Sequence, residues 1–156
     1  MSDITRYQNR FIAGERLAEA VATTLAGINT PVRVYALPRG GIPVAVPIAN
    51  RLNCPLEVLA AKKIALPSNP ELALGAIAPD GTTVWNQSSG LWERYQQELK
   101  QAREEALEGA IAQQKQFNPH CPCASVKESI VILVDDGIAT GMTMFSAIKA
   151  LREKQP

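Results

Sequence analysis

The sequence predicts an α/β protein with an open, mostly parallel, doubly wound sheet, a projecting β-hairpin flap and a long helical insertion. Three observations predict this fold. Short apolar segments rich in β-formers alternate with longer segments of helical periodicity, which is typical of parallel strands joined by crossover helices. Two of the short segments run directly into glycine-containing loops. An Asp-Gly pair between two further apolar runs is typical of a hairpin turn.

Composition limits the number of domains and the kinds of partner. The 156 residues are 46% hydrophobic and 20% charged, which predicts one domain over residues 1–156. The formal net charge is only +1 and the longest apolar run covers residues 130–134, so neither a nucleic-acid partner nor a membrane is expected. The chain has three cysteines, Cys54, Cys121 and Cys123. An odd number predicts free thiols in a reducing, cytoplasmic compartment. His120 and the last two cysteines offer at most three zinc ligands, so we expect incidental thiols there.

Each element of the first half is predicted from its own pattern. Leucine and valine recur every four residues over residues 11–26, and this spacing predicts an amphipathic helix. The glycine that follows is suited to cap the end of the helix. Residues 32–37 are apolar and rich in β-formers, so they predict a strand that ends before a glycine pair. Residues 42–52 predict a helix in which Pro47 forces a kink or a late start. Residues 55–60 predict a second short strand.

The second half begins with a predicted hairpin. Residues 72–78 and 82–85 are apolar runs on either side of Pro79-Asp80-Gly81, and the hairpin is expected to project from the sheet. Over residues 89–117 apolar side chains recur every three or four residues, which predicts a long helix, an insertion or hood, whose other face is charged and solvated. Residues 118–128 lack periodicity and predict a connecting loop.

The segment over residues 131–143 indicates the chemistry. A β-branched run at residues 129–134 predicts a strand buried on both faces, two acids follow it, and helical spacing resumes over residues 142–154. The loop between them can turn successive backbone N–H groups inward, and the positive end of the helix dipole points at the same place. The sequence therefore predicts a phosphate site. Its expected residues are Ile138, Ala139, Thr140, Gly141, Met142 and Thr143.

The acids and hydroxyls of this segment refine the predicted ligand. Thr140 and Thr143 add hydroxyl donors, and Gly141 has no Cβ, so the backbone can approach a phosphate closely. Asp135 and Asp136 would repel a phosphate in direct contact, so we expect them one ribose-length away, accepting hydrogen bonds from sugar hydroxyls. The pattern favours a sugar phosphate over a nucleotide P-loop, because no Gly-Lys-Ser/Thr follows the loop.

Residues 131–143 resemble the phosphoribosyl-pyrophosphate signature of type I phosphoribosyltransferases, an apolar strand followed by two acids and a loop ending in Thr-Gly-x-Thr. The run Leu37-Pro38-Arg39-Gly40-Gly41 resembles the pyrophosphate loop of the same family. Lys62-Lys63, with residues 68–73 and 9–18, resembles an uncharacterised subgroup of predicted phosphoribosyltransferases. Each of these two loops follows a predicted parallel strand. If the two strands lie next to each other in the sheet, the loops would form one cleft.

The resemblance implies an enzyme that transfers ribose 5-phosphate from phosphoribosyl pyrophosphate to a base or amine acceptor and releases pyrophosphate. It implies that Asp135 and Asp136 bind the 2′ and 3′ hydroxyls and help to position Mg²⁺, directly or through water. The phosphate-site residues would hold the 5-phosphate, and Arg39, Gly40 and Gly41 would receive pyrophosphate.

The resemblance also assigns roles around the cleft. Lys62 and Lys63 are either solvated surface lysines or substrate contacts, and strand alternation lets only one of them face the cleft. We take Lys63 as catalytic, with Asp135, Asp136 and Arg39, and Lys62 as a substrate contact. The hairpin over residues 72–85 is expected to be a mobile flap. Since it has no lysine or arginine, the alternative is a noncatalytic regulatory protein that binds phosphoribosyl pyrophosphate or a nucleotide.

The family resembled here continues with further strands after the last predicted helix. We therefore expect a shortened form whose final strand leaves an open sheet edge. An open edge favours pairing between copies, so a homo-oligomer is expected.

Overall fold

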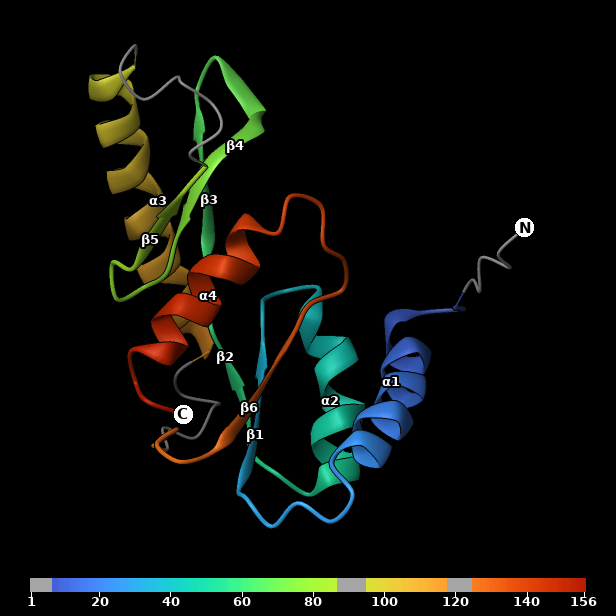
Figure 1. The fold of residues 1–156 in the computed structure, drawn as a ribbon. Helices are drawn as coiled ribbons and strands as arrows, with labels where there is room; N and C mark the ends of the chain where they lie inside the picture. Colours follow the sequence, from blue (N-terminus) through green and yellow to red (C-terminus); the bar gives the residue numbers. More distant parts are fainter. Residues whose placement is uncertain (1–6, 87–94, 118–124) are drawn as a thin grey trace.

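The computed structural model describes residues 7–86, 95–117 and 125–156, and its strands form two separate sheets (Figure 1). Sheet A is parallel, in the order β2-β1-β6, and sheet B is antiparallel, in the order β3-β4-β5. The predicted α/β class is therefore confirmed. The strands are β1 (Val32–Ala36), β2 (Leu56–Val58), β3 (Lys62–Leu66), β4 (Asn69–Ile77), β5 (Thr83–Trp85) and β6 (Ile130–Val134), and the helices are α1 (Arg10–Thr24), α2 (Gly41–Leu52), α3 (Gln96–Phe117) and α4 (Met142–Arg152).

Helices α1 and α2 cover one face of sheet A. Successive residues of a strand point to opposite faces, and Val34, Ala36 and Val134 pack in one buried cluster with apolar residues of both helices. The two helices lie side by side (Figure 1) and approach closely at Gly14, where a Cβ would come 2.5 Å from the Val44 backbone oxygen. This packing fixes the start of α1 close to the ends of β1 and β6.

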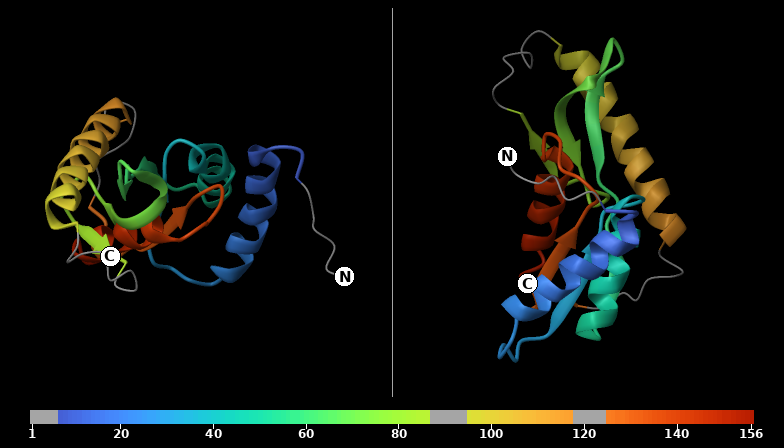
Figure 2. Two further views of the ribbon diagram at one scale, coloured as in Figure 1. Left: turned by 90° about the horizontal axis from the view of Figure 1, so that it is seen from above. Right: turned by 90° about the vertical axis from the view of Figure 1, so that its right-hand side faces the viewer.

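Helix α4 is shared between the two sheets (Figure 1). The opposite face of sheet A, with Tyr35, Leu37 and Leu133, packs against α4. On the same helix the fully buried Ser146 donates a hydrogen bond of 3.1 Å to the Thr82 carbonyl at the β4–β5 turn. The other face of sheet B packs against α3, and Figure 2 shows α3 and α1 at opposite ends of the molecule.

Most predicted elements are confirmed, with ends shifted by a few residues. Pro47 lies inside α2, which begins at Gly41, so the helix does not start late. The predicted hairpin is present as β4 and β5, with the Gly81 N–H donating to the Ala78 carbonyl in its turn. Among the residues described, no helix is both long enough and apolar enough to cross a membrane.

Three details differ from the prediction. Strand β3 was not predicted, and it pairs with β4 so that the hairpin becomes a three-stranded sheet. As a result, the end of sheet B that projects from the molecule is the β3–β4 turn, whereas the predicted tip at residues 79–81 adjoins α4 (Figure 1). Residues 130–133 of β6 are only half-buried, because β6 is an edge strand of sheet A in the described part of the chain. The predicted long helix is present as α3 over Gln96–Phe117, and its predicted residues 89–94 lie outside the described residues.

Candidate functional site

The candidate site lies where the order of sheet A reverses. From β1 the chain passes through α2 to β2 on one side, while β6 pairs with β1 on the other side. The register pairs Ala36 with Val134, so the loops that follow these two strands begin at the same level. Ligands of open α/β sheets bind at such a point, outside the carboxyl ends of the strands. We call residues 37–41 the Arg-Gly-Gly loop and residues 135–141 the Asp loop.

The two loops contact each other because glycines occupy the Arg-Gly-Gly loop. A Cβ on Gly40 would overlap the Asp136 carboxylate, and a Cβ on Gly41 would lie 2.6 Å from the Val134 backbone oxygen. The Leu37 N–H also donates to that oxygen at 2.9 Å. The Pro38–Arg39 peptide of this loop is cis.

The two acids of the Asp loop have different surroundings. Asp135 lines a hollow on the α4 side together with Lys63 and residues 137–141 of the loop, but without Asp136. Asp136 lies against Gly40, and its Oδ2 accepts a hydrogen bond of 2.7 Å from Arg10 Nε. The Asp136 N–H donates to Asp135 Oδ1 at 2.8 Å. Burial raises the pKa of Asp135; the backbone hydrogen bond from Asp136 opposes this rise, and the neighbouring Asp136 charge adds to it.

The Asp loop leads into α4 through a backbone conformation that requires glycine. Gly141 has φ 74°, in the left-handed region, and it forms the N-cap of α4. The first N–H groups of a helix have no partner within the helix. The Met142 N–H donates to Thr140 Oγ1 at 3.5 Å, so the next two N–H groups, those of Thr143 and Met144, are the ones available to an anion. The hollow in front of them has a volume of about 220 Å³. Its lining residues are Lys63, Asp135, Gly137, Ile138, Ala139, Thr140, Gly141, Thr143 and Met144.

The basic residues of the site come from separate elements. Lys63 of β3 lines the hollow of the Asp loop. Lys62, its neighbour, is not brought there: its Cε lies on the α3 side, 3.8 Å from the position a Cβ on Gly109 would take. Arg39 is exposed, and its Nη2 donates a hydrogen bond of 3.0 Å to Gln116 Oε1.

Arg10 and Gln116 are the contacts that sequence reasoning missed. Arg10 is 126 residues from Asp136 along the chain, and Gln116 is 77 residues from Arg39. No local pattern marks either residue as part of the site, because only the folding of α1 and α3 onto the sheets brings them there. The resemblance at residues 9–18 includes Arg10 but gives it no role.

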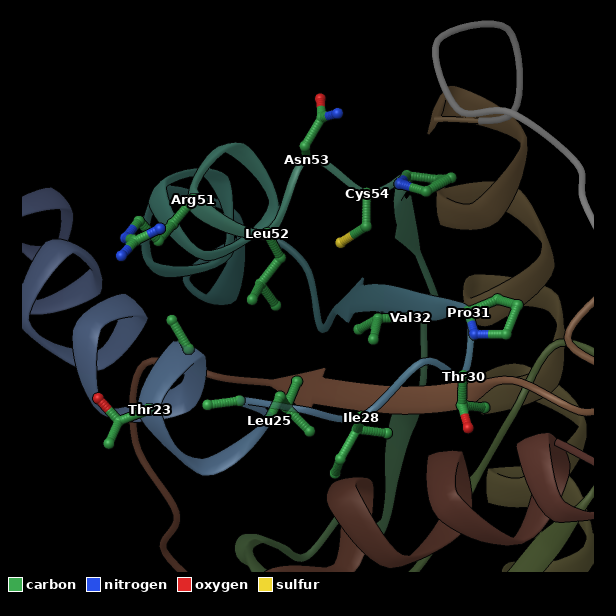
Figure 3. A pocket seen from close by; sticks show the side chains of 13 residues that line it. Thr23, Leu25, Ile28, Thr30, Pro31, Val32, Arg51, Leu52, Asn53 and Cys54 are labelled. Atoms are coloured by element: carbon green, nitrogen blue, oxygen red, sulfur yellow. The ribbon is translucent and has the colours of Figure 1, made fainter.

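A larger hollow lies at the other end of sheet A (Figure 3). It has a volume of about 820 Å³ and lies at the amino ends of β1 and β2, next to Val32 and Cys54. Burial is the main factor that raises the pKa of the Cys54 thiol. None of the described residues that line this hollow carries a carboxylate, and it faces away from the carboxyl edge, so its size does not make it the better candidate.

Side chains that could bind a metal ion are scattered over the described part of the chain. They include no cluster of three or more His, Cys, Asp or Glu side chains suited to a metal ion. His120, Cys121 and Cys123 lie outside the described residues. Asp135 and Asp136 are the acids at the candidate site, and two carboxylates suit a Mg²⁺ ion that takes its other oxygen ligands from water and substrate.

These features define an α/β protein whose candidate site lies between two loops at the carboxyl edge of its parallel sheet, where a helix start lies beside two acids. The sequence model of the phosphoribosyl transferase domain matches residues 1–156. The chain belongs to this family.

Comparison with known proteins identifies relatives along nearly the whole chain. Two provisionally named phosphoribosyl transferases of Mycobacterium tuberculosis, from strains CDC 1551 and H37Rv, are each 36% identical over 148 residues, or 94% of this chain. This chain spans only about a third, 32%, of their length. The crystal structure of TT1426 from Thermus thermophilus has a similar fold, with a TM-score of 0.74 and 36% identity, covering 97% of this chain and 71% of that one.

Proposed function

We propose that the chain binds phosphoribosyl pyrophosphate between the Arg-Gly-Gly loop and the Asp loop, and that it transfers ribose 5-phosphate to a base or amine acceptor. One observation carries the proposal: Gly40 lies directly against the Asp136 carboxylate. A loop suited to a diphosphate thereby adjoins two acids suited to ribose hydroxyls. Membership of the phosphoribosyl transferase family supports the same assignment.

In this proposal the 5-phosphate occupies the hollow of the Asp loop. The N–H groups at the start of α4 and the hydroxyls of Thr140 and Thr143 would donate to its oxygens. Asp135 and Asp136 would accept hydrogen bonds from the ribose hydroxyls. Lys63, at the edge of the same hollow, would bring a positive charge to the bound anion.

The pyrophosphate group would lie along the Arg-Gly-Gly loop, where Arg39 supplies charge and the Gly40 N–H would donate. The Gly41 N–H already donates to the Leu37 carbonyl at 3.0 Å. Asp135 Oδ1 and Asp136 Oδ2 are engaged within the protein, and the second oxygen of each carboxylate is suited to a hard cation or its water. A bound Mg²⁺ would neutralise charge on the ribose and diphosphate oxygens.

In the proposed reaction the bond between C1′ and the pyrophosphate oxygen breaks, and the acceptor nitrogen forms a bond to C1′ and loses a proton. Positive charge develops on the ribose as pyrophosphate leaves. The residues named above act by holding the sugar in a reactive orientation and by stabilising the leaving anion, which together account for much of the rate of such transfers.

Calorimetry with phosphoribosyl pyrophosphate and Mg²⁺ tests the binding step. Asp135→Asn and Asp136→Asn keep the shape of each side chain but remove a charged acceptor. We expect each to weaken binding by about 1.5–3 kcal/mol, as for hydrogen bonds to charged groups. Glu153→Gln, at the far end of α4, removes an exposed charge and is expected to leave binding unchanged. Equal binding by all four proteins would contradict the proposal.

A second function is favoured by the hairpin of β4 and β5, which carries no lysine or arginine over residues 72–85. A noncatalytic regulator would bind phosphoribosyl pyrophosphate without turnover. Incubation with phosphoribosyl pyrophosphate, Mg²⁺ and a panel of bases and amines separates the two. Release of pyrophosphate with one acceptor supports the enzyme, whereas binding without release across the panel supports the regulator.

A further inference from the structure

Arg10 reaches the candidate site from a helix that takes no part in either loop. It is the first residue of α1, and the Asn9 side chain caps this helix by accepting a 2.9 Å hydrogen bond from the Ile12 N–H. The Arg10 Nε then donates at 2.7 Å to Asp136 Oδ2. On its other side the same carboxylate lies against Gly40. Asp136 is thus held between a guanidinium group and a glycine backbone.

This arrangement leaves Asp136 with one oxygen engaged and one available. A carboxylate offers about four lone-pair positions, so the contact with Arg10 restricts its orientation without consuming its capacity to accept from a ligand. Arginine suits this task, because its guanidinium is charged at every relevant pH and donates in a fixed plane. Asp135, the neighbouring residue, is also negatively charged. A cation beside Asp136 therefore also offsets the repulsion between the two carboxylates.

We propose that Arg10 is a positioning residue: it fixes the Asp136 carboxylate over Gly40, so that the free oxygen faces the ligand. This inference rests on the proposed function, since the ligand is taken to be the ribose of phosphoribosyl pyrophosphate with its Mg²⁺.

Arg10 acts through Asp136 and does not itself form part of the phosphate hollow. Arg10 and Asp136 line a separate hollow with Tyr7, Phe11 and Pro43, and Arg10 is absent from the lining of the hollow of the Asp loop. The Arg10 side chain is 61% exposed and the Asp136 side chain 30%. Helix α1 is held to α2 by apolar packing, so the loss of this ion pair is expected to leave the fold intact.

Calorimetry of three variants tests the inference. Arg10→Met keeps an apolar stem but removes the guanidinium, and we expect it to weaken binding of phosphoribosyl pyrophosphate with Mg²⁺ about fivefold, equivalent to ~1 kcal/mol, the upper range for an exposed ion pair. Arg10→Lys keeps a charge and should restore part of this loss. Arg16→Met removes an exposed arginine from the same helix and should bind as the parent does.

A double-mutant cycle separates positioning from direct contact. In an Asp136→Asn background, Arg10→Met is expected to cause little further loss, because the charged partner is already absent. An equal fivefold loss in that background would overturn the inference, and so would parent-like binding by Arg10→Met alone.

Ligand-free crystal structures of the parent and Arg10→Met distinguish failure of the inference from failure of the proposed function. The Asp136 carboxylate is expected to leave its position over Gly40 when the guanidinium is removed. If it stays there, Arg10 does not position it. If the parent fails to bind phosphoribosyl pyrophosphate, the proposed function is wrong, while the two crystal structures still decide whether Arg10 fixes Asp136.

Discussion

At the scale of single residues, Gly40 shows why the candidate site needs glycine in a position with ordinary backbone geometry. Its φ of −66° and ψ of −32° are those of a right-handed helix, which any residue adopts. A side chain is excluded by space, because its Cβ would overlap the Asp136 carboxylate. Gly141 is the opposite case: its φ of 74° requires glycine for conformation.

Gly40→Ala is therefore expected to push the Asp136 carboxylate away and to weaken binding of phosphoribosyl pyrophosphate by about tenfold or more, the equivalent of ~1.4 kcal/mol. Calorimetry measures the loss. Gly109→Ala in α3 is the control, because it lies outside both loops and a Cβ there would make only an ordinary contact, 3.8 Å from Lys62 Cε. The prediction is wrong if both alanine variants bind equally well.

Both loops could be predicted from the sequence, because each carries its pattern in consecutive residues. Arg39 and Gly40 precede a helix start, and Asp135 and Asp136 follow a β-branched run. Contacts made by Arg10 could not be predicted, since nothing in a linear pattern reports that α1 begins beside the carboxyl end of β6.

At the scale of elements, α1 is positioned by a helix crossing that allows almost no space. Gly14 is buried, and a Cβ would meet the Val44 backbone oxygen at 2.5 Å and a Pro47 side-chain atom at 3.0 Å. The Val44 backbone oxygen cannot rotate away from an added methyl group, as a flexible side chain can. The approach of α1 to α2, and with it the location of Arg10, therefore depends on one missing methyl group.

Gly14→Ala is expected to destabilise the protein by about 1–3 kcal/mol through overpacking, although alanine is the better helix former. Gly109→Ala in α3 is the matched control, because its Cβ would lie 3.8 Å from Lys62 Cε, an ordinary contact. It is expected to stabilise by about 0.5–1 kcal/mol. Urea unfolding measures both changes. Equal shifts in the two variants would show that the helix crossing is not tight.

Element prediction failed mainly at β3. Residues 62–66 begin with two lysines and are too short for a clear alternation. What makes them a strand is pairing with β4 and packing of Ile64 with Ile77 and Ala102, both of which depend on tertiary structure. The turn at residues 79–81 could be predicted, because its Asp-Gly pair is a local signal. Without β3 in the prediction, this turn is expected to project, whereas the projecting end is the β3–β4 turn.

At the scale of the whole molecule, the two edge strands of sheet A differ in what covers their backbone groups. The β2 edge is covered by Gln114 of α3, whose amide donates to the Val58 carbonyl and accepts from the Ala60 N–H, both at 2.8 Å. The β6 edge has no neighbouring strand among the described residues. Ile130 and Val134 bond to the β1 side, so parallel geometry directs the backbone groups of Val131 outward.

We expect this β6 edge to pair with a second copy. Sedimentation equilibrium should find a species heavier than the monomer whose fraction falls on dilution. Val131→Pro removes the outward N–H and should give a monomer, whereas Val131→Ala, which keeps the N–H, should still associate. Circular dichroism checks that both variants fold. A parent that is monomeric at every concentration would contradict the expectation.

The shared position of α4 has a consequence for how the protein loses its structure. Helix α4 covers one face of sheet A, and its buried Ser146 is hydrogen-bonded to the β4–β5 turn of sheet B. Detaching α4 therefore exposes apolar surface on both sheets at once. Neither sheet retains a complete interior after the other has opened. Heat should therefore melt both halves together, in one cooperative step.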